Sequence, residues 1–195
     1  MNTTGLFGQQ HWISLLYLGS TVAVFVGVMM FTYRVFLHGR LFPGFVRWER
    51  GLVALAAVVC VLGFIVLAAA LRARGELVFS WVGLAVVALG AALIVVAELR
   101  TVIGLTSTLG QTVSLPELSG EDPLIVLGVA LTFIGQAFYG VSLLHTALTP
   151  AWAGWLLVIW NLGWLVLVFL FSARDPYYPV LFYIGPVVLG ILLWR

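Results

Sequence analysis

Uncharged polar side chains inside apolar runs are the residues with which this chain could do chemistry. One run carries Thr132, Gln136, Tyr139 and Ser142, and Asn161 lies in the middle of the next run. Gln136 and Tyr139 are three residues apart and therefore share one face of a helix. We expect these groups either to line a polar path or a ligand site, or to hydrogen-bond between helices.

Two charged residues near the ends of apolar runs are further candidates. Arg34 lies near the end of the first run and Glu98 near the end of the third. Ionisable groups within a membrane segment are functional candidates because hydrocarbon penalises charge. The expected topology puts both at similar depth on one side of the bilayer, where they could form an ion pair. The alternative is that the Arg34 side chain extends to the headgroups.

The chain has three histidines, His11, His38 and His145, and one cysteine, Cys60. A haem held by two histidines needs both ligands within reach of one haem, but the expected topology puts His38 and His145 on opposite sides. No carboxylate lies near His11 or His145 in the sequence. A single cysteine excludes an intramolecular disulfide and a cysteine-based metal site. We predict no metal and no cofactor, and interpret the histidines as interfacial residues.

Catalytic sequence motifs are absent. The chain has no Walker A motif, no dinucleotide fingerprint, no H-E-x-x-H and no G-x-S-x-G. No apolar run has an Asp or Glu at mid-depth for proton coupling. The sequence therefore predicts a protein that is not an enzyme, and it disfavours a secondary active transporter and an intramembrane protease.

The elements that position these residues are long apolar runs. Hydrophobic residues make up 63% of the 195 residues and charged residues only 8%, against about 25% charged in soluble domains. A helix needs about 20 apolar residues to cross a bilayer. Six transmembrane helices are predicted in a single all-α domain: Trp12–Leu37, Gly51–Leu71, Leu77–Leu99, Pro123–Leu144, Ala151–Phe171 and Tyr178–Trp194. Residues 100–122 form the longest connection, whose first part could extend the third helix or lie along the membrane interface.

Arginines set the expected orientation. All 9 basic residues are arginine, and the absence of lysine favours a GC-rich bacterial genome. More of them lie on the side of the first connection than on the opposite side, so the positive-inside rule places the first connection on the inner side. The chain is then predicted to lie in the inner (plasma) membrane with both termini on its outer side. The net charge of +2 is too small and dispersed for nucleic-acid binding.

A self-match suggests an internal repeat. Residues 37–48 and 144–155 share the frame L-H-x-x-L-x-P-x-aromatic-x-x-W, which carries His38, Pro43, Trp48, His145, Pro150 and Trp155. A second match aligns Gly90 with Gly190. Two units of three helices, 12–99 and 123–195, would insert with opposite orientation as an inverted repeat. The alternative is convergence, since helices that restart at an interface often use Pro and Trp there.

Residues 125–195 resemble the C-terminal half of a bacterial family of multi-pass membrane proteins of unknown function. The resemblance is carried by the stretch Leu148-Thr-Pro-Ala-Trp-Ala-Gly-Trp-Leu156, followed by Pro179 and Pro186 in the last helix. Ala151 departs from the basic residue that usually follows the proline. The resemblance implies a compact helical bundle and no activity.

Three functions remain open from the sequence. The leading one is a non-enzymatic bundle that acts as an accessory subunit or binding module for a lipid or a larger membrane protein complex. The second is a small passive channel or carrier for an uncharged or hydrophobic solute, lined by Gln136, Tyr139 and Asn161. The third is a membrane redox subunit that binds haem or quinone.

Overall fold

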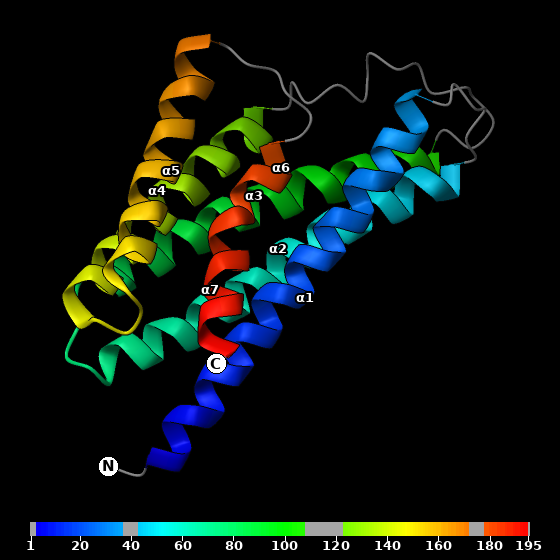
Figure 1. Cartoon of the computed structure of the whole chain (residues 1–195). Helices are drawn as coiled ribbons and strands as arrows, with labels where there is room; N and C mark the ends of the chain where they lie inside the picture. The colour runs from blue at the N-terminus through cyan, green and yellow to red at the C-terminus, as the bar shows by residue number, and fades with distance from the viewer. Residues whose placement is uncertain (1–2, 37–42, 108–122, 172–177, 195) are drawn as a thin grey trace.

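The computed structural model describes the backbone of residues 3–36, 43–107, 123–171 and 178–194. Throughout these ranges the regular elements are α-helices (Figure 1). In chain order they are α1 (Thr3–Phe36), α2 (Pro43–Arg72), α3 (Phe79–Ser107), α4 (Pro123–Thr146), α5 (Ala151–Phe171), α6 (Tyr178–Phe182) and α7 (Ile184–Trp194). The prediction of an all-helical chain is therefore confirmed.

Four helices are long and apolar enough to cross a membrane. The qualifying stretches are Gln10–Tyr33, Phe45–Arg72, Phe79–Ile103 and Pro123–Thr146. Large apolar side chains on their outer faces are exposed, for example Val22 at 62% and Ile103 at 65%. Such faces are unfavourable in water and favourable in hydrocarbon, so the fold is that of a helical membrane protein. Shorter apolar helices cover Ala151–Leu167 and Val180–Trp194.

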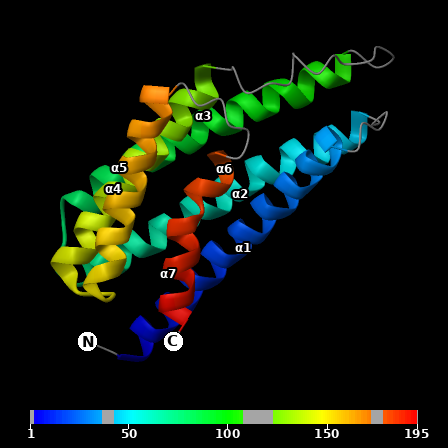
Figure 2. The ribbon, with the colours of Figure 1, turned by 45° about the horizontal axis from the view of Figure 1, so that its top comes forward.

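Successive long helices run in opposite directions (Figures 1 and 2). α1 packs along α2, α3 packs along α4, α5 lies on α4, and α7 lies on α1. The start of α1 and the end of α7 lie at the same end of the bundle, where the rings of His11 and Trp194 are 5.6 Å apart. The ends of α2, α4 and the starts of α3, α5 lie toward this end as well.

Glycines allow α3 and α4 to approach closely. A Cβ atom on Gly83 would lie 2.9 Å from the carbonyl oxygen of Gly135, and one on Gly90 would lie 2.6 Å from that of Gly128. Both distances are shorter than normal van der Waals contact, so no larger residue fits while the two backbones stay in place. The seven-residue spacing of these glycines in each helix predicts such a stripe, and the structure confirms it.

Helix ends differ from the hydropathy prediction where charged residues lie inside a helix. α2 begins at Pro43 rather than at Gly51, so Glu49 and Arg50 belong to its first turns. Proline is suited to the first turn of a helix because no intrahelical donor is needed there. α3 continues past Leu99 to Ser107, which confirms that the 100–122 connection begins as an extension of this helix.

The predicted last helix, Tyr178–Trp194, is interrupted at Tyr183 and forms α6 and α7. Pro186 explains the interruption, because proline has no N–H and its ring clashes with the carbonyl group four residues earlier. That carbonyl belongs to Phe182, the last residue of α6. The expectation of one continuous helix here was therefore wrong.

Glu76 begins α3. Its Oε1 atom accepts hydrogen bonds from the backbone N–H groups of Val78 at 2.9 Å and Phe79 at 2.7 Å, and its Oε2 atom accepts one from Ser80 at 2.8 Å. These donors have no partner within the helix. Burial alone would raise the pKa of this carboxyl group, but the hydrogen bonds from Ser80, Phe79 and Val78 outweigh burial and lower the pKa below its usual value.

Candidate functional site

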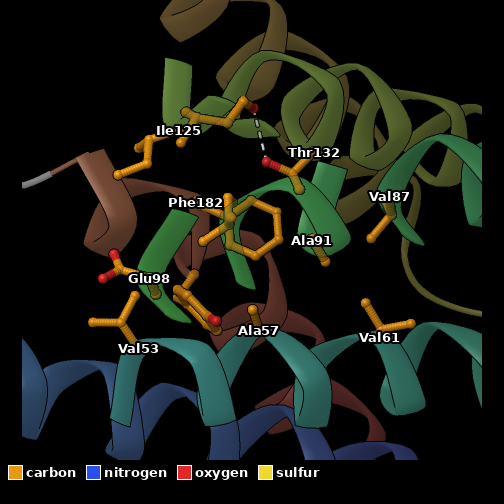
Figure 3. A pocket seen from close by; sticks show the side chains of 12 residues that line it. Val53, Ala57, Val61, Val87, Ala91, Glu98, Ile125, Thr132 and Phe182 are labelled. Atoms are coloured by element: carbon orange, nitrogen blue, oxygen red, sulfur yellow. Dashed lines mark hydrogen bonds between the residues drawn. The ribbon is translucent and has the colours of Figure 1, made fainter. Parts of the chain in front are cut away.

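A crevice lies between α2 and α4, with α3 as its floor (Figure 3). α2 and α4 both pack along α3 but make little contact with each other. The cavity volume of the crevice is about 30 Å³, and about 500 Å³ is reached only when all the space between its atoms and the open space at its mouth are counted. Its lining consists of Val53, Ala57, Val61, Val87, Ala91, Ile94, Glu98, Ile125, Val129, Thr132, Phe182 and Tyr183.

The crevice is long and apolar. Along α3 it extends from Val87 to Glu98, which is about 16 Å at the helical rise of 1.5 Å per residue. Ala57 and Ala91 line it with small side chains, and Phe182 projects between α2 and α4 (Figure 3). The hydroxyl group of Thr132 donates to the carbonyl oxygen of Val129 at 2.7 Å, within its own helix. The walls therefore present mainly hydrocarbon to an occupant.

A cluster of charged side chains lies where the crevice reaches Glu98. Nη1 of Arg50 is 3.2 Å from each carboxylate oxygen of Glu98. Nε of Arg50 is 3.6 Å from Oε1 of Glu49. The carboxylates are nearly buried, with side chains 3% and 4% exposed, and the Arg50 side chain is 13% exposed. Partly buried charges of this kind are tolerated when they are paired, so this cluster supplies the charge at one end of an otherwise apolar site.

The interruption between α6 and α7 forms part of the crevice wall through Phe182 and Tyr183. Pro186 cannot donate to the carbonyl oxygen of Phe182, and Nε2 of Gln136 donates to that oxygen at 3.0 Å instead. A freed carbonyl group inside a membrane protein needs such a partner, because hydrocarbon offers none. Gln136 thus satisfies the interrupted helix from α4.

Trp160 contacts the interruption from α5. Its indole Nε1 donates to the carbonyl oxygen of Leu181 at 3.0 Å. The last two carbonyl groups of α6 are therefore held by side chains of two different helices. This arrangement fixes the position of Phe182, and with it one wall of the crevice. Trp160 was not among the residues predicted from the sequence, and the position of Pro186 does not point to it, because the residue four after Leu181 is Gly185, which has an N–H group.

The other polar candidates lie in the core and outside the crevice. The hydroxyl group of Tyr139 donates to the carbonyl oxygen of Phe64 in α2 at 2.9 Å. Nδ2 of Asn161 donates to the carbonyl oxygen of Leu157 at 2.6 Å, within α5. Gln136, Tyr139 and Asn161 are each 0% exposed. These side chains were expected either to line a polar path or ligand site or to hydrogen-bond between helices. Gln136 and Tyr139 form hydrogen bonds between helices.

Glu98 has its ion pair with Arg50, a residue that sequence analysis placed outside the helices. Arg34 belongs to the last turns of α1, but its side chain lies outside the part of the structure that is described. The pairing of Arg34 with Glu98 therefore stays a prediction.

The interfacial motif residues lie at helix ends where they are described. Trp48 is 69% exposed and Trp155 is 55% exposed. Pro150 directly precedes α5 and Pro43 opens α2. His145 is exposed and its ring lies 5.6 Å from that of Phe79. His38 lies outside the described residues. These positions suit headgroup contacts and do not converge on one site.

Among the described residues, no three His, Cys, Asp or Glu side chains gather where they could hold a metal ion. No family model matches the chain, and no curated protein or solved structure is similar to it. The resemblance to a bacterial membrane family thus stays a prediction.

Proposed function

We propose that this chain is a non-enzymatic, membrane-embedded binding module that takes the hydrocarbon chain of a membrane lipid into the α2–α4 crevice. The observation that carries the proposal is the lining, which is apolar along about 16 Å and bears one carboxylate, that of Glu98, at one end. A site inside a bilayer is surrounded by lipid chains, so an open apolar crevice there meets them at high concentration. Apolar walls with few polar groups are typical of such ligand sites.

Two features favour this function over a channel for polar solutes. The polar side chains expected to line a pore, Gln136 and Tyr139, donate instead to backbone carbonyl oxygens of other helices. Removing either bond to admit a solute would leave a carbonyl group without that donor in the core, which is unfavourable in a membrane. A lipid chain needs no polar path and leaves both bonds in place.

Placement in the bilayer is part of the proposal. We infer six crossings, with α5 as the fifth and α6–α7 together as the sixth, and both termini outside the inner (plasma) membrane. The Glu98 end of the crevice then lies toward the inner headgroups, on the side with more arginines. In a Cys60→Ala background, a cysteine at Ala147 should react with an impermeant thiol reagent added to intact cells, and one at Arg100 should not. Labelling at position 100 but not at position 147 would show that the termini lie on the inner side of the membrane.

We further infer that the fold consists of two inverted three-helix units. Two equivalent contacts support it. Gly90 of α3 lies against Gly128 of α4, and Gly190 of α7 lies against Leu18 of α1, where a Cβ atom would be 3.0 Å from Cγ. Gly90 and Gly190 hold the same place in the internal sequence match, so the units would meet twice through matched helix pairs, as a pseudo-two-fold axis requires. The interruption at Tyr183 has no counterpart in α3.

The experiment compares two neighbouring alanines of α3. Ala91 lines the crevice, whereas Ala92 is exposed on the outer face. The wild type, Ala91→Phe and Ala92→Phe are purified in a mild detergent, and lipids that stay bound are quantified by mass spectrometry. We expect about one lipid per wild-type chain, the same for Ala92→Phe, and most of it lost from folded Ala91→Phe. Equal lipid content in all three proteins would overturn the proposal. Retention of a stoichiometric protein complex without bound lipid would support the accessory subunit instead.

A further inference from the structure

The cavity inside the crevice is small, and its size limits what it can hold. Its volume of about 30 Å³ is close to the share of one water molecule in the liquid, and far below the roughly 150 Å³ of an engineered cavity that binds benzene. The lipid chain proposed above would lie in the open space at the mouth. The cavity itself has room only for a molecule of very few heavy atoms, whether or not a lipid chain covers it.

The walls of this cavity offer little to a water molecule. Nine of the twelve lining residues have pure hydrocarbon side chains, and the other three are Glu98, Thr132 and Tyr183. The Thr132 hydroxyl group donates to the carbonyl oxygen of Val129 within α4. Glu98 and Tyr183 are only 3% and 4% exposed, and Glu98 is paired with Arg50. A buried water needs about two to four polar partners, and apolar cavities without them stay dry.

The cavity lies among helices that are apolar enough to cross a membrane. α2, α3 and α4 line it, and each contains such a stretch. Ala57 of α2 and Ala91 of α3 contribute single methyl groups to the lining (Figure 3). Apolar molecules favour hydrocarbon over water, so apolar gases dissolved in the bilayer surround this site at a higher concentration than in water.

Occupancy by a small apolar molecule is favourable for two reasons. Atoms that line an empty cavity lack dispersion contacts on one side, and an occupant of the right size restores them. A larger occupant would force the walls apart, which costs free energy as overpacking does. We infer that the cavity is a dry site that binds one molecule of the dissolved-gas class, a small apolar diatomic such as dioxygen. This site goes beyond the proposed lipid-binding function and does not rest on it.

The test follows alanine methyl groups by NMR. The full chain in nanodiscs is studied under dioxygen, with argon at the same pressure as the reference, because paramagnetic dioxygen speeds the relaxation of nuclei that it contacts. Ala57 lines the cavity, Ala56 is buried elsewhere in α2, and Ala92 is exposed on the outer face of α3. We expect the effect on the Ala57 methyl group to be at least as large as that on Ala92, which meets gas dissolved in lipid. The Ala56 methyl group should show little effect.

Two variants identify the site. Ala91→Val enlarges a side chain of the cavity wall and should abolish the dioxygen effect at Ala57, whereas Ala92→Val should leave it unchanged. An Ala57 effect no larger than that at Ala56 would overturn the inference, and so would an undiminished effect in folded Ala91→Val. Magnetisation transfer between water and the Ala57 methyl group would also overturn it, because water would then fill the cavity.

The comparison of Ala57 with Ala56 in the wild type remains decisive if Ala91→Val folds poorly. Lipid retention is measured in a separate experiment, so failure of the gas site leaves the proposed lipid binding in place, and the reverse also holds.

Discussion

Nε2 of Gln136 lies 3.0 Å from the carbonyl oxygen of Phe182, to which it donates a hydrogen bond. Pro186, four residues after Phe182, has no N–H with which to make that bond. One buried amide on α4 thus compensates for one proline in α7. The same contact sets the position of Phe182, which lines the crevice.

This compensation predicts a coupling between Gln136 and Pro186. Gln136→Leu keeps the side-chain volume but leaves the Phe182 carbonyl group without its donor, so it should destabilise the protein by about 1–3 kcal/mol. Pro186→Ala restores a backbone N–H that can reach the same oxygen. In the double variant the Gln136→Leu penalty should fall by at least about half. Thermal unfolding in detergent measures all four proteins, and additive effects of the two substitutions would contradict the coupling.

The contact of α3 with α4 predicts opposite effects for two glycines. Gly90→Ala would place a Cβ atom 2.6 Å from a backbone oxygen of Gly128, and helix separation to relieve the clash should cost about 1–3 kcal/mol. Gly163 of α5 is exposed and has no atom within 4 Å of the added Cβ. Gly163→Ala should therefore be neutral or stabilise by up to about 1 kcal/mol. Equal effects of both substitutions on unfolding would show that α3 and α4 do not meet at these glycines.

The charged cluster predicts that Arg50 is important for stability. Arg50→Met removes the guanidinium group from between two nearly buried carboxylates, and loss of one partner of such a pair costs about 3–5 kcal/mol. Replacing both Arg50 and Glu98 by Met should cost less than Arg50→Met alone, because fewer buried charges then lack a counter-charge. Arg100→Met, at an exposed position of the same bundle end, serves as the control. A control as damaging as Arg50→Met would argue against the ion pairs.

Glu76 predicts an acid-sensitive contribution to stability. Its pKa is lower in the folded protein than its usual value of 4.5, so its stabilising effect is complete above about pH 4.5 and is lost as the pH falls through the lower folded-state pKa. Glu76→Gln removes this titration. The difference in Tm between the wild type and Glu76→Gln should be constant at neutral pH and should shrink below about pH 4.5. A difference that is independent of pH would mean that the carboxylate does not hold the start of α3.

Hydropathy predicts the positions of these helices well because the bilayer imposes a length of apolar sequence. It fails at Glu49 and Arg50, where a run of charged residues resembles a loop. α2 accommodates both residues because Arg50 pairs with Glu98 of α3 and with Glu49 beside it in α2. Pairing between helices is a tertiary property that no sequence window contains. The glycine stripe was predictable because the same spacing occurs in both partner helices.

The crevice could not be predicted. It exists because α2 and α4 both pack on α3 and make little contact with each other, and that separation depends on the shapes of three helices together. The role of Gln136 lay closer to prediction, since Pro186 signals a carbonyl group in need of a donor. Which polar residue would supply it depends on how α4 faces α6, and the sequence offers Gln136, Asn161 and Trp160 at once.

The most direct test of the central claim is to locate a lipid chain on the protein. A lipid with a photoreactive diazirine in its chain is incorporated into nanodiscs with the full protein, activated by light, and the modified residues are mapped by peptide mass spectrometry. The account predicts adducts concentrated on crevice residues such as Val87, Ala91 and Val129, and their loss in Ala91→Phe. Adducts confined to outward-facing residues such as Leu89 and Val96, which are 55% and 43% exposed, would contradict it.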